Sequence, residues 1–228
     1  MRLKGKLLSV LVPLMLVPLL GLAAAAYVQM RDQARLQAEQ ELGTLLGQLQ
    51  LYGRDLQSTA IANLQLFTNS SQIQAYLLDE SEVNRFQLLQ PSLLRLLASY
   101  QAAYPEYYEI RLLLPDGYED TRSTRNASRN VSEDESSSPL FRALQASGED
   151  ALLHFDVNPD DDRFVLYAGR AISLVDPSQD PLAARPRLRG YLALTIDLEG
   201  LARQIAASQA GAKGYLFAVD AEGIIRVH

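Results

Sequence analysis

An uncharged apolar stretch near the N-terminus constrains this chain more than any other feature. Residues 7–28 read LLSVLVPLMLVPLLGLAAAAYV and contain no charged side chain. A helix of this length rises about 1.5 Å per residue and spans about 33 Å, which is enough to cross the hydrocarbon core of a bilayer. Prolines within it are tolerated in membrane helices, where neighbouring groups satisfy the carbonyls that lose a partner. We therefore expect a transmembrane helix over residues 7–28.

The charges beside this stretch predict its orientation. Residues 1–6 contain three basic side chains, and the first acidic residue of the chain is Asp32. Because basic flanks stay in the cytoplasm, we expect residues 1–6 on the cytoplasmic side of the inner (cell) membrane. The bulk of the chain is then expected to be periplasmic.

A cleaved signal peptide is the alternative interpretation of the N-terminus. The basic start, the apolar core and four alanines at 23–26 also fit that template. The apolar run is longer than a usual signal core of about 7–15 residues, and helix-compatible sequence continues beyond it, so we favour an anchor. Both interpretations place the rest of the chain in the same compartment.

Composition excludes several classes of function. The chain of 228 residues has a formal net charge of −6, no cysteine and two histidines. It therefore has no disulfide, no catalytic thiolate and too few histidines for a histidine-built metal site. The part beyond the apolar stretch is more acidic than the whole, which argues against nucleic acid and anionic lipid head groups as partners. Since no nucleophile-elbow or phosphate-loop motif occurs, we expect no catalytic residue, metal or cofactor.

A proline-free segment follows the apolar stretch and predicts a long stalk helix over residues 29–78. A break at residues 69–71, with a short helical continuation, is plausible because Asn and Ser favour caps and turns. The apolar seam could face a partner helix in a homodimer or a domain lying alongside it. Its residues recur at three and four spacing and are Leu42, Leu45, Leu49, Tyr52 and Leu56, continued by Asn63 or Leu64 and then Phe67.

Beyond the stalk, the periodicity predicts a mixed helix-and-sheet domain. A helix fits residues 82–104, and Pro91 should bend or split it. Alternating segments bounded by turn residues then predict strands. The fold class is therefore α+β, with an antiparallel sheet of about five strands flanked by helices. The strands are expected at 107–114, 118–122, 152–157, 163–175 and 188–196, with helices at 139–147 and 197–207 and a long exposed loop at 123–138.

The end of the chain starts a new pattern. Residues 215–219 and 224–227 predict a hairpin after a linker-like break. An isolated hairpin is marginally stable at best. We therefore expect residues 210–228 to open a second, smaller module, and the chain to be a fragment of a longer protein.

Four segments carry a resemblance to a known family. They read EIRLLLPDG at 109–117, SPLFR at 138–142, GYLALTIDL at 190–198 and GYLFAVDAEG at 214–223. In this order, after a membrane span and a long helix, the chain resembles the double Cache (dCache, PAS-like) extracytoplasmic sensor domains of bacterial transmembrane receptors. It is most similar in style to those of diguanylate cyclases and phosphodiesterases.

The resemblance implies two sensor modules in this chain and an output domain beyond it. Residues 79–209 would form a membrane-distal sensor module, and residues 210–228 the start of a membrane-proximal one. A small-molecule ligand would bind the distal module and act through the long helix on a cytoplasmic output domain beyond His228. That domain would turn over cyclic-di-GMP, while this fragment would not be an enzyme. The alternatives are the sensor of a histidine kinase or chemoreceptor, or a dimerisation or protein-interaction module without a small ligand.

The sequence departs from the family's amino-acid-binding subgroup. That subgroup has an Arg-x-Trp-Tyr element near the short helix, and this chain has no tryptophan. Where many members place an aspartate in the last strand, this chain has Thr195. An amino acid is therefore not indicated as the ligand.

Polar and aromatic residues on one face of the predicted sheet are the candidate ligand site. Alternation places Tyr107, Glu109 and Arg111 on one face of the first strand and Tyr108 and Ile110 on the other. A pocket under the short helix combines apolar walls with a few polar groups. Arg111 or Arg122 could form a bidentate pair with a ligand carboxylate, so the ligand could be anionic. The candidates are Arg111, Arg122, His154, Tyr167 and Tyr191; the alternative is that these residues face solvent.

Two acidic runs could suggest calcium loops. Residues 133–135 and 160–162 each hold three consecutive carboxylates. A calcium loop needs alternating ligands, a central glycine and a distal glutamate, and neither run has that spacing. We therefore interpret both runs as solvated turns.

The predicted topology can be tested with reporter fusions. A periplasm-active phosphatase inserted within residues 123–138 should be active, because the basic flank holds residues 1–6 in the cytoplasm. A fusion at residue 3 is the control and should be inactive. Phosphatase activity only at residue 3 would contradict the orientation.

Overall fold

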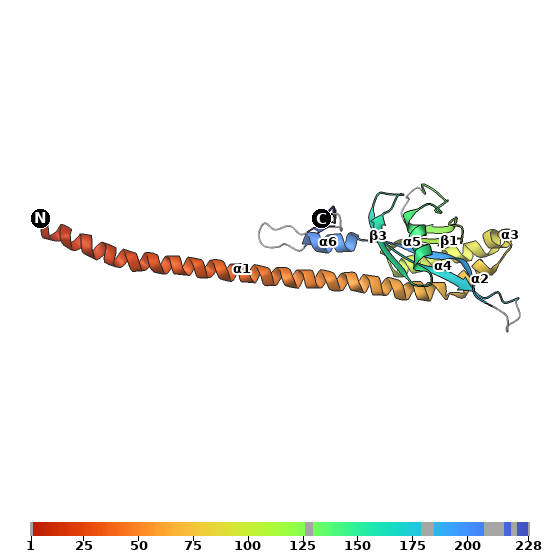
Figure 1. Ribbon diagram of the computed structural model, residues 1–228, viewed down its shortest axis with the longest axis horizontal. Helices are drawn as coiled ribbons and strands as arrows, with labels where there is room; N and C mark the ends of the chain where they lie inside the picture. The colour runs from red at the N-terminus through yellow and green to blue at the C-terminus, as the bar shows by residue number, and fades with distance from the viewer. Residues whose placement is uncertain (1, 126–129, 179–184, 208–216, 220–222, 228) are drawn as a thin grey trace. The chain divides into compact units, whose positions relative to one another are not determined.

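The computed structural model describes residues 2–125, 130–178, 185–207, 217–219 and 223–227, and it divides into two compact units. In the described part, the first unit is the helix up to Leu49, and the second begins at Gln50 and contains the sheet. Helix α1 (Arg2–Thr68) begins in the first unit and ends in the second (Figure 1).

The N-terminal part of α1 has the properties of a membrane span by length and composition. From Leu14 onward, an 18-residue window of this helix has a mean hydropathy of 1.5, and none of its residues is buried. Large apolar side chains such as Leu14 and Leu22 are each 71% exposed. This unpacked apolar surface fits the expected N-terminal membrane helix.

The second unit is built on an open antiparallel sheet. Five strands lie in the order β2-β1-β5-β4-β3, and every neighbouring pair is antiparallel. The predicted α+β class and five-stranded sheet are therefore confirmed. The strands are β1 (Tyr107–Leu113), β2 (Glu119–Thr124), β3 (Leu152–Val157), β4 (Phe164–Leu174) and β5 (Arg187–Asp197).

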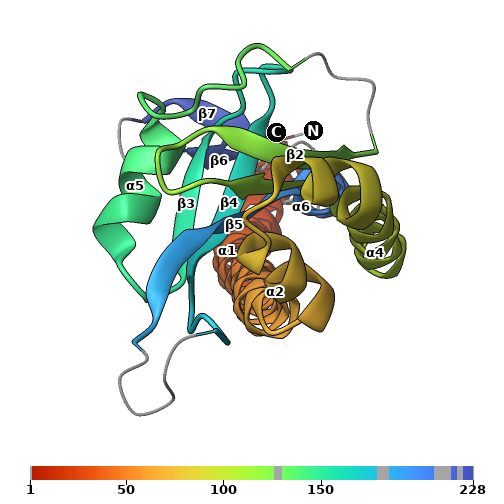
Figure 2. The same ribbon diagram turned by 90° about the vertical axis from the view of Figure 1, so that its right-hand side faces the viewer.

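Helices cover the two faces of this sheet unequally. Figure 2 shows α5 (Pro139–Ser147) on one face, with α2 (Ser71–Leu78) and α4 (Gln90–Ala103) on the other. The second face also carries the C-terminal part of α1, so it holds the larger apolar core. A helix α6 (Glu199–Ala207) follows β5, and the Asp197 carboxylate accepts a hydrogen bond from the Glu199 backbone N–H at 2.7 Å, as expected for a cap.

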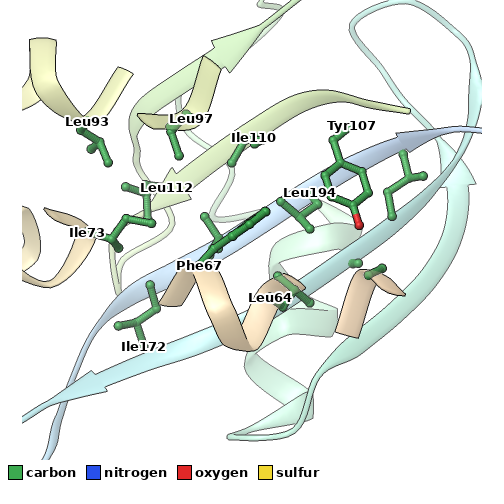
Figure 3. Packing of buried hydrophobic residues seen from close by; sticks show 14 of the residues in the cluster. Leu64, Phe67, Ile73, Leu93, Leu97, Tyr107, Ile110, Leu112, Ile172 and Leu194 are labelled. Carbon is green, nitrogen blue, oxygen red and sulfur yellow. The ribbon is translucent and has the colours of Figure 1, made fainter. Parts of the chain in front are cut away.

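The C-terminal part of α1 belongs to the core of the second unit. Leu64 and Phe67 are fully buried and lie against Ile110, Leu112 and Leu194 of the sheet (Figure 3). The Phe67 ring stacks on Tyr100 of α4, with centroids 3.7 Å apart. The seam predicted for the stalk helix therefore faces the domain alongside it over this part of α1.

The helical segments after α1 break where the sequence indicates. Helix α1 ends at Thr68 and α2 begins at Ser71, so the predicted interruption is present. The predicted helix 82–104 is divided into α3 (Glu82–Asn84), a π-helical turn η1 (Arg85–Leu89) and α4. Pro91 lies in the first turn of α4. Because proline has no N–H to donate to the preceding turn, the wider π turn accommodates it.

A β-bulge corrects the predicted faces of β1. The register with β5 shifts between Tyr107 and Glu109, so one extra residue is inserted there. Tyr107 consequently packs in the helix-side core with Ile110, and Tyr108 lies in the cluster below α5. The strict alternation that placed Tyr107 beside Glu109 was wrong, because a bulge reverses the faces on one side of it.

The described residues of the C-terminal segment form a short hairpin. Strands β6 (Ala218–Val219) and β7 (Ile225–Val227) pair antiparallel, as predicted for this segment. The rest of the predicted hairpin, 215–216 and 220–222, lies outside the described residues. The module boundary at residue 210 stays a prediction.

Phe67→Ala should distinguish a core role from a stalk role. The substitution removes the ring that stacks on Tyr100, and truncating a buried Phe costs about 3–5 kcal/mol. Leu66→Ala is the matched control, because Leu66 is 63% exposed and should change stability by less than about 0.5 kcal/mol. Urea unfolding of the full chain in detergent measures both. If both variants lost the same small amount of unfolding free energy, the assignment of Phe67 to the core would be contradicted.

Candidate functional site

Local sequence signals define the start and the end of the short helix α5, which covers one face of the sheet. The Ser138 hydroxyl accepts a hydrogen bond from the Phe141 backbone N–H at 3.0 Å, Pro139 occupies the first turn and Gly148 follows the end with φ +61°. These are the favoured residues for a helix start and stop. Phe141 and Leu144 are the buried anchors of α5 against β4 and β5.

A cavity of about 180 Å³ lies where the start of α5 meets the sheet. Its apolar wall comes from α5, the end of β3 and the turn after it. Its polar wall includes Arg111 of β1 and Tyr167 of β4, and Glu135 lines it from the loop before α5. The lining residues are Arg111, Glu135, Ser138, Pro139, Leu140, Asp156, Val157, Pro159 and Tyr167.

Arg111 is the centre of a buried ionic cluster beside this cavity. Its side chain is 1% exposed. Nη2 donates to Glu109 Oε2 at 2.5 Å, and Nη1 donates to Glu135 Oε1 at 3.1 Å. The Glu119 carboxylate lies 3.6 Å from Nε. Burial lowers the pKa of this guanidinium, but Glu109 and Glu119 raise it by more, so Arg111 stays charged.

Arg122 closes the same cluster from β2. Its guanidinium donates to Glu109 Oε1 from Nε at 2.7 Å and from Nη2. Nη2 also donates to Asp160 Oδ2 at 2.8 Å, and the same oxygen accepts from Arg111 Nη2 at 2.9 Å. Asp160 thereby joins both arginines. We call these six residues, Glu109, Arg111, Glu119, Arg122, Glu135 and Asp160, the arginine–carboxylate cluster.

Neutral side chains fix the position of the cluster in the fold. Asn158 is fully buried; its Nδ2 donates to the Tyr108 hydroxyl at 2.8 Å and its Oδ1 accepts from Arg111 at 3.4 Å. Thr195 of β5 donates to Glu109 Oε2 at 3.0 Å. These bonds tie the turn after β3 to the central strands.

The arginine–carboxylate cluster has an excess of carboxylates. Four carboxyl groups share two guanidinium groups among the described residues. Burying unpaired negative charge is costly, so one carboxyl tends to bind a proton. Burial raises the pKa of the Glu119 carboxyl to about 7 against the lowering effect of both arginines.

Two predicted site residues line the cavity, and three do not. Arg111 and Tyr167 lie in its wall. Arg122 lies behind it, on Glu109 and Asp160. His154 is partly exposed on β3, with Nε2 3.5 Å from Asp156 Oδ2. Tyr191 packs edge-on against Phe141, with ring centroids 5.5 Å apart, within the apolar cluster under α5. We expected an arginine to pair with a ligand carboxylate. In the structure, Arg111 and Arg122 pair with carboxylates of the protein itself.

The interpretation of both acidic runs as solvated turns was partly wrong. Glu135 and Asp160 each have side chains at most 8% exposed and pair with Arg111. Their neighbours Glu133 and Asp162 are exposed, as expected of a turn. Arg111 and Arg122 lie opposite each other on β1 and β2. One arginine on each strand of a predicted hairpin, together with two acidic turns, was the signal in the sequence that could have indicated this pairing.

A second hollow, of about 260 Å³, lies where α1 ends against β4. Its polar lining includes Gln65, Asn69 and Glu149, all of which are exposed. This hollow is therefore a surface groove, and the cavity beside Arg111 is the better candidate for a ligand site.

Several solved structures have an architecture similar to that of this chain. The ligand-binding domain of the Campylobacter jejuni chemoreceptor Tlp3 in complex with L-valine matches with a TM-score of 0.55 and 17% identity, over 80% of this chain and 67% of that one. A sensory box/GGDEF family protein domain from Vibrio parahaemolyticus matches at 0.52 and 17%, over 71% and 61%. The V. cholerae histidine kinase DctB sensor domain matches at 0.53 and 14%, over 72% and 57%.

The described domain has a Cache-like fold. The matches to these sensor domains extend over 71–80% of this chain, with TM-scores of 0.52–0.55. At this level of identity, the likeness of the Cache-like domain to its neighbours concerns the fold alone. No family model matches the sequence, and no curated protein sequence matches it.

Glu119→Gln should remove a pH dependence of stability. The folded pKa of about 7 lies above the ordinary value of 4.5, so the contribution of Glu119 is present at low pH and lost as pH rises through 7. Between about pH 5 and pH 8, the wild type should lose on the order of 2 kcal/mol more unfolding free energy than the variant. Glu133→Gln, on an exposed neighbour, should keep the wild-type slope. Identical slopes for all three proteins would refute the raised pKa.

Proposed function

We propose that this chain is the periplasmic ligand-sensing part of a transmembrane signalling receptor. The observation that carries the proposal is the cavity beside Arg111 within a Cache-like fold. Ligand sites combine an apolar wall with a few placed polar groups, and this cavity does so. The bound amino acids of the chemoreceptor neighbours support a small-molecule ligand.

The proposed signal passes through α1. The helix runs without interruption from the apolar stretch to Phe67 in the core of the Cache-like domain. Binding shifts the helix only if the ligand has different affinities for two arrangements of the domain. Homodimerisation through the exposed or half-exposed leucines of the stalk, such as Leu45, Leu46 and Leu49, completes the proposal.

The output that we propose lies in a cytoplasmic domain outside this chain. A domain for cyclic-di-GMP turnover is our first choice, in line with the resemblance to cyclase-linked sensors. A histidine kinase or chemoreceptor output is supported equally by the structural neighbours.

Filling the cavity tests the proposed site. A panel of metabolites is screened for compounds that raise the melting temperature of the wild-type full chain in detergent. A ligand at a hundredfold excess over its Kd should raise the free energy of unfolding by about 2.7 kcal/mol. Val157→Phe places a ring in the cavity and should abolish that response. Val175→Phe, at an exposed position, should retain it. A ligand that still stabilises Val157→Phe would locate the site elsewhere, and a broad panel without any hit would remove the sensor proposal.

A further inference from the structure

The polar groups that line the cavity differ in whether they already have partners. The Ser138 hydroxyl accepts the bond that caps α5. One Asp156 oxygen accepts from the Val157 backbone N–H, and the other faces His154. Arg111 is held by the arginine–carboxylate cluster. Ser138 and Arg111 are therefore engaged within the protein, and Asp156, whose side chain is 38% exposed, is also open to solvent.

Two groups in the cavity wall remain available to a ligand. Tyr167 is 3% exposed, and its hydroxyl has no hydrogen-bond partner among the described residues. Glu135 is 6% exposed; its Oε1 accepts from Arg111, whereas its Oε2 has no hydrogen-bond partner in the described part of the chain. Nearly buried polar groups without partners are rare in native proteins, because each one forfeits hydrogen bonds that it had in water.

The charge around the cavity is negative. The arginine–carboxylate cluster has two more carboxyl groups than guanidinium groups, and Asp156 adds another carboxyl to the lining. The start of α5 opposes this with about half a positive charge from its aligned peptide dipoles. That contribution is smaller than the carboxylate excess even if Glu119 is protonated. A cation entering the cavity is therefore favoured over an anion.

We propose that the cavity binds a small organic cation, a short alkylammonium group whose N–H donors reach Glu135 and Tyr167. An ammonium nitrogen has donors only, which matches an available carboxylate oxygen and a hydroxyl oxygen. Pro139, Leu140 and Val157 supply an apolar wall for the alkyl part. The cavity volume of 180 Å³ corresponds to about six water molecules, so a ligand group that fits inside it has only a few non-hydrogen atoms. This inference rests on the sensor function proposed above.

Three two-carbon probes of different charge test the inference. Ethylammonium, acetate and acetamide are compared at millimolar concentration and constant ionic strength, with the melting temperature of the full chain in detergent as the readout. Ethylammonium should raise the melting temperature, and acetate and acetamide should not. Sodium chloride makes up the ionic strength in every sample, so a rise with ethylammonium alone reports the organic cation and not the salt concentration.

Two variants remove the proposed contacts one at a time. Glu135→Gln removes the charge while an amide oxygen can still accept from Arg111, and Tyr167→Phe removes only the hydroxyl. Each should weaken the apparent affinity for ethylammonium by about tenfold or more, the effect of losing a hydrogen bond to a charged group. Glu133→Gln and Tyr191→Phe are the matched controls and should retain the wild-type affinity. Since the Tyr167 hydroxyl has no partner, Tyr167→Phe should fold normally.

The outcomes separate this inference from the proposed function. Stabilisation by acetate or acetamide would overturn the cationic ligand and leave the sensor function in place. The same conclusion would follow if ethylammonium had no effect while another metabolite stabilised the wild type but not Val157→Phe. A response to ethylammonium that survives in both Glu135→Gln and Tyr167→Phe also overturns it. If no probe or metabolite stabilises the wild type, the sensor function itself fails.

Discussion

The burial of one guanidinium group organises the α5-facing side of this domain. Arg111 is 1% exposed on a central strand, and a buried charge is tolerated only when it is paired and hydrogen-bonded. Its partners come from β1, β2, the loop before α5 and the turn after β3. Segments far apart in the sequence therefore meet at one point. Removing Arg111 would take the arginine partner from the buried Glu119 and Glu135 and leave Arg122 to pair with Glu109 and Asp160, and breaking a buried ion pair in this way costs about 3–5 kcal/mol.

The same pairing changes what the cavity can recognise. An arginine in a pocket ordinarily indicates a carboxylate or phosphate ligand, because its planar donors match those groups. Here the donors of Arg111 are used by Glu109, Glu135 and Asp160, so its charge is more than neutralised before any ligand arrives. The chemistry of the site is set by what remains unpaired rather than by the most conspicuous residue.

Local signals explain why much of the fold could be predicted from the sequence. The bounds of α5 and β3 were predicted to the residue, because Ser138, Pro139 and Gly148 mark a helix start and stop, and turn residues bound the strand. The bulge at Tyr107 could not be predicted, since it depends on the register with β5. Arg111 and Tyr167 were correctly placed on the α5 side, but the burial of Glu135 and Asp160 depends on contacts across the fold that no local pattern encodes.

The sheet itself provides the physical link between the cavity and the helix. On β1, Arg111 faces the cavity while its neighbours Ile110 and Leu112 pack in the core that holds Leu64 and Phe67. On β4, Tyr167 faces the cavity while Leu166 and Ala168 face that same core. Successive residues of a strand point to opposite faces and share one backbone, so a displacement of the strand at Arg111 or Tyr167 also displaces their neighbours on the other face. Protein cores are close-packed, so such a tilt is transmitted to α1 rather than absorbed in free space. In the proposed receptor, a ligand that pulled Glu135 or Tyr167 toward itself would therefore act, through a single layer of strands, on the part of α1 that is buried against the sheet.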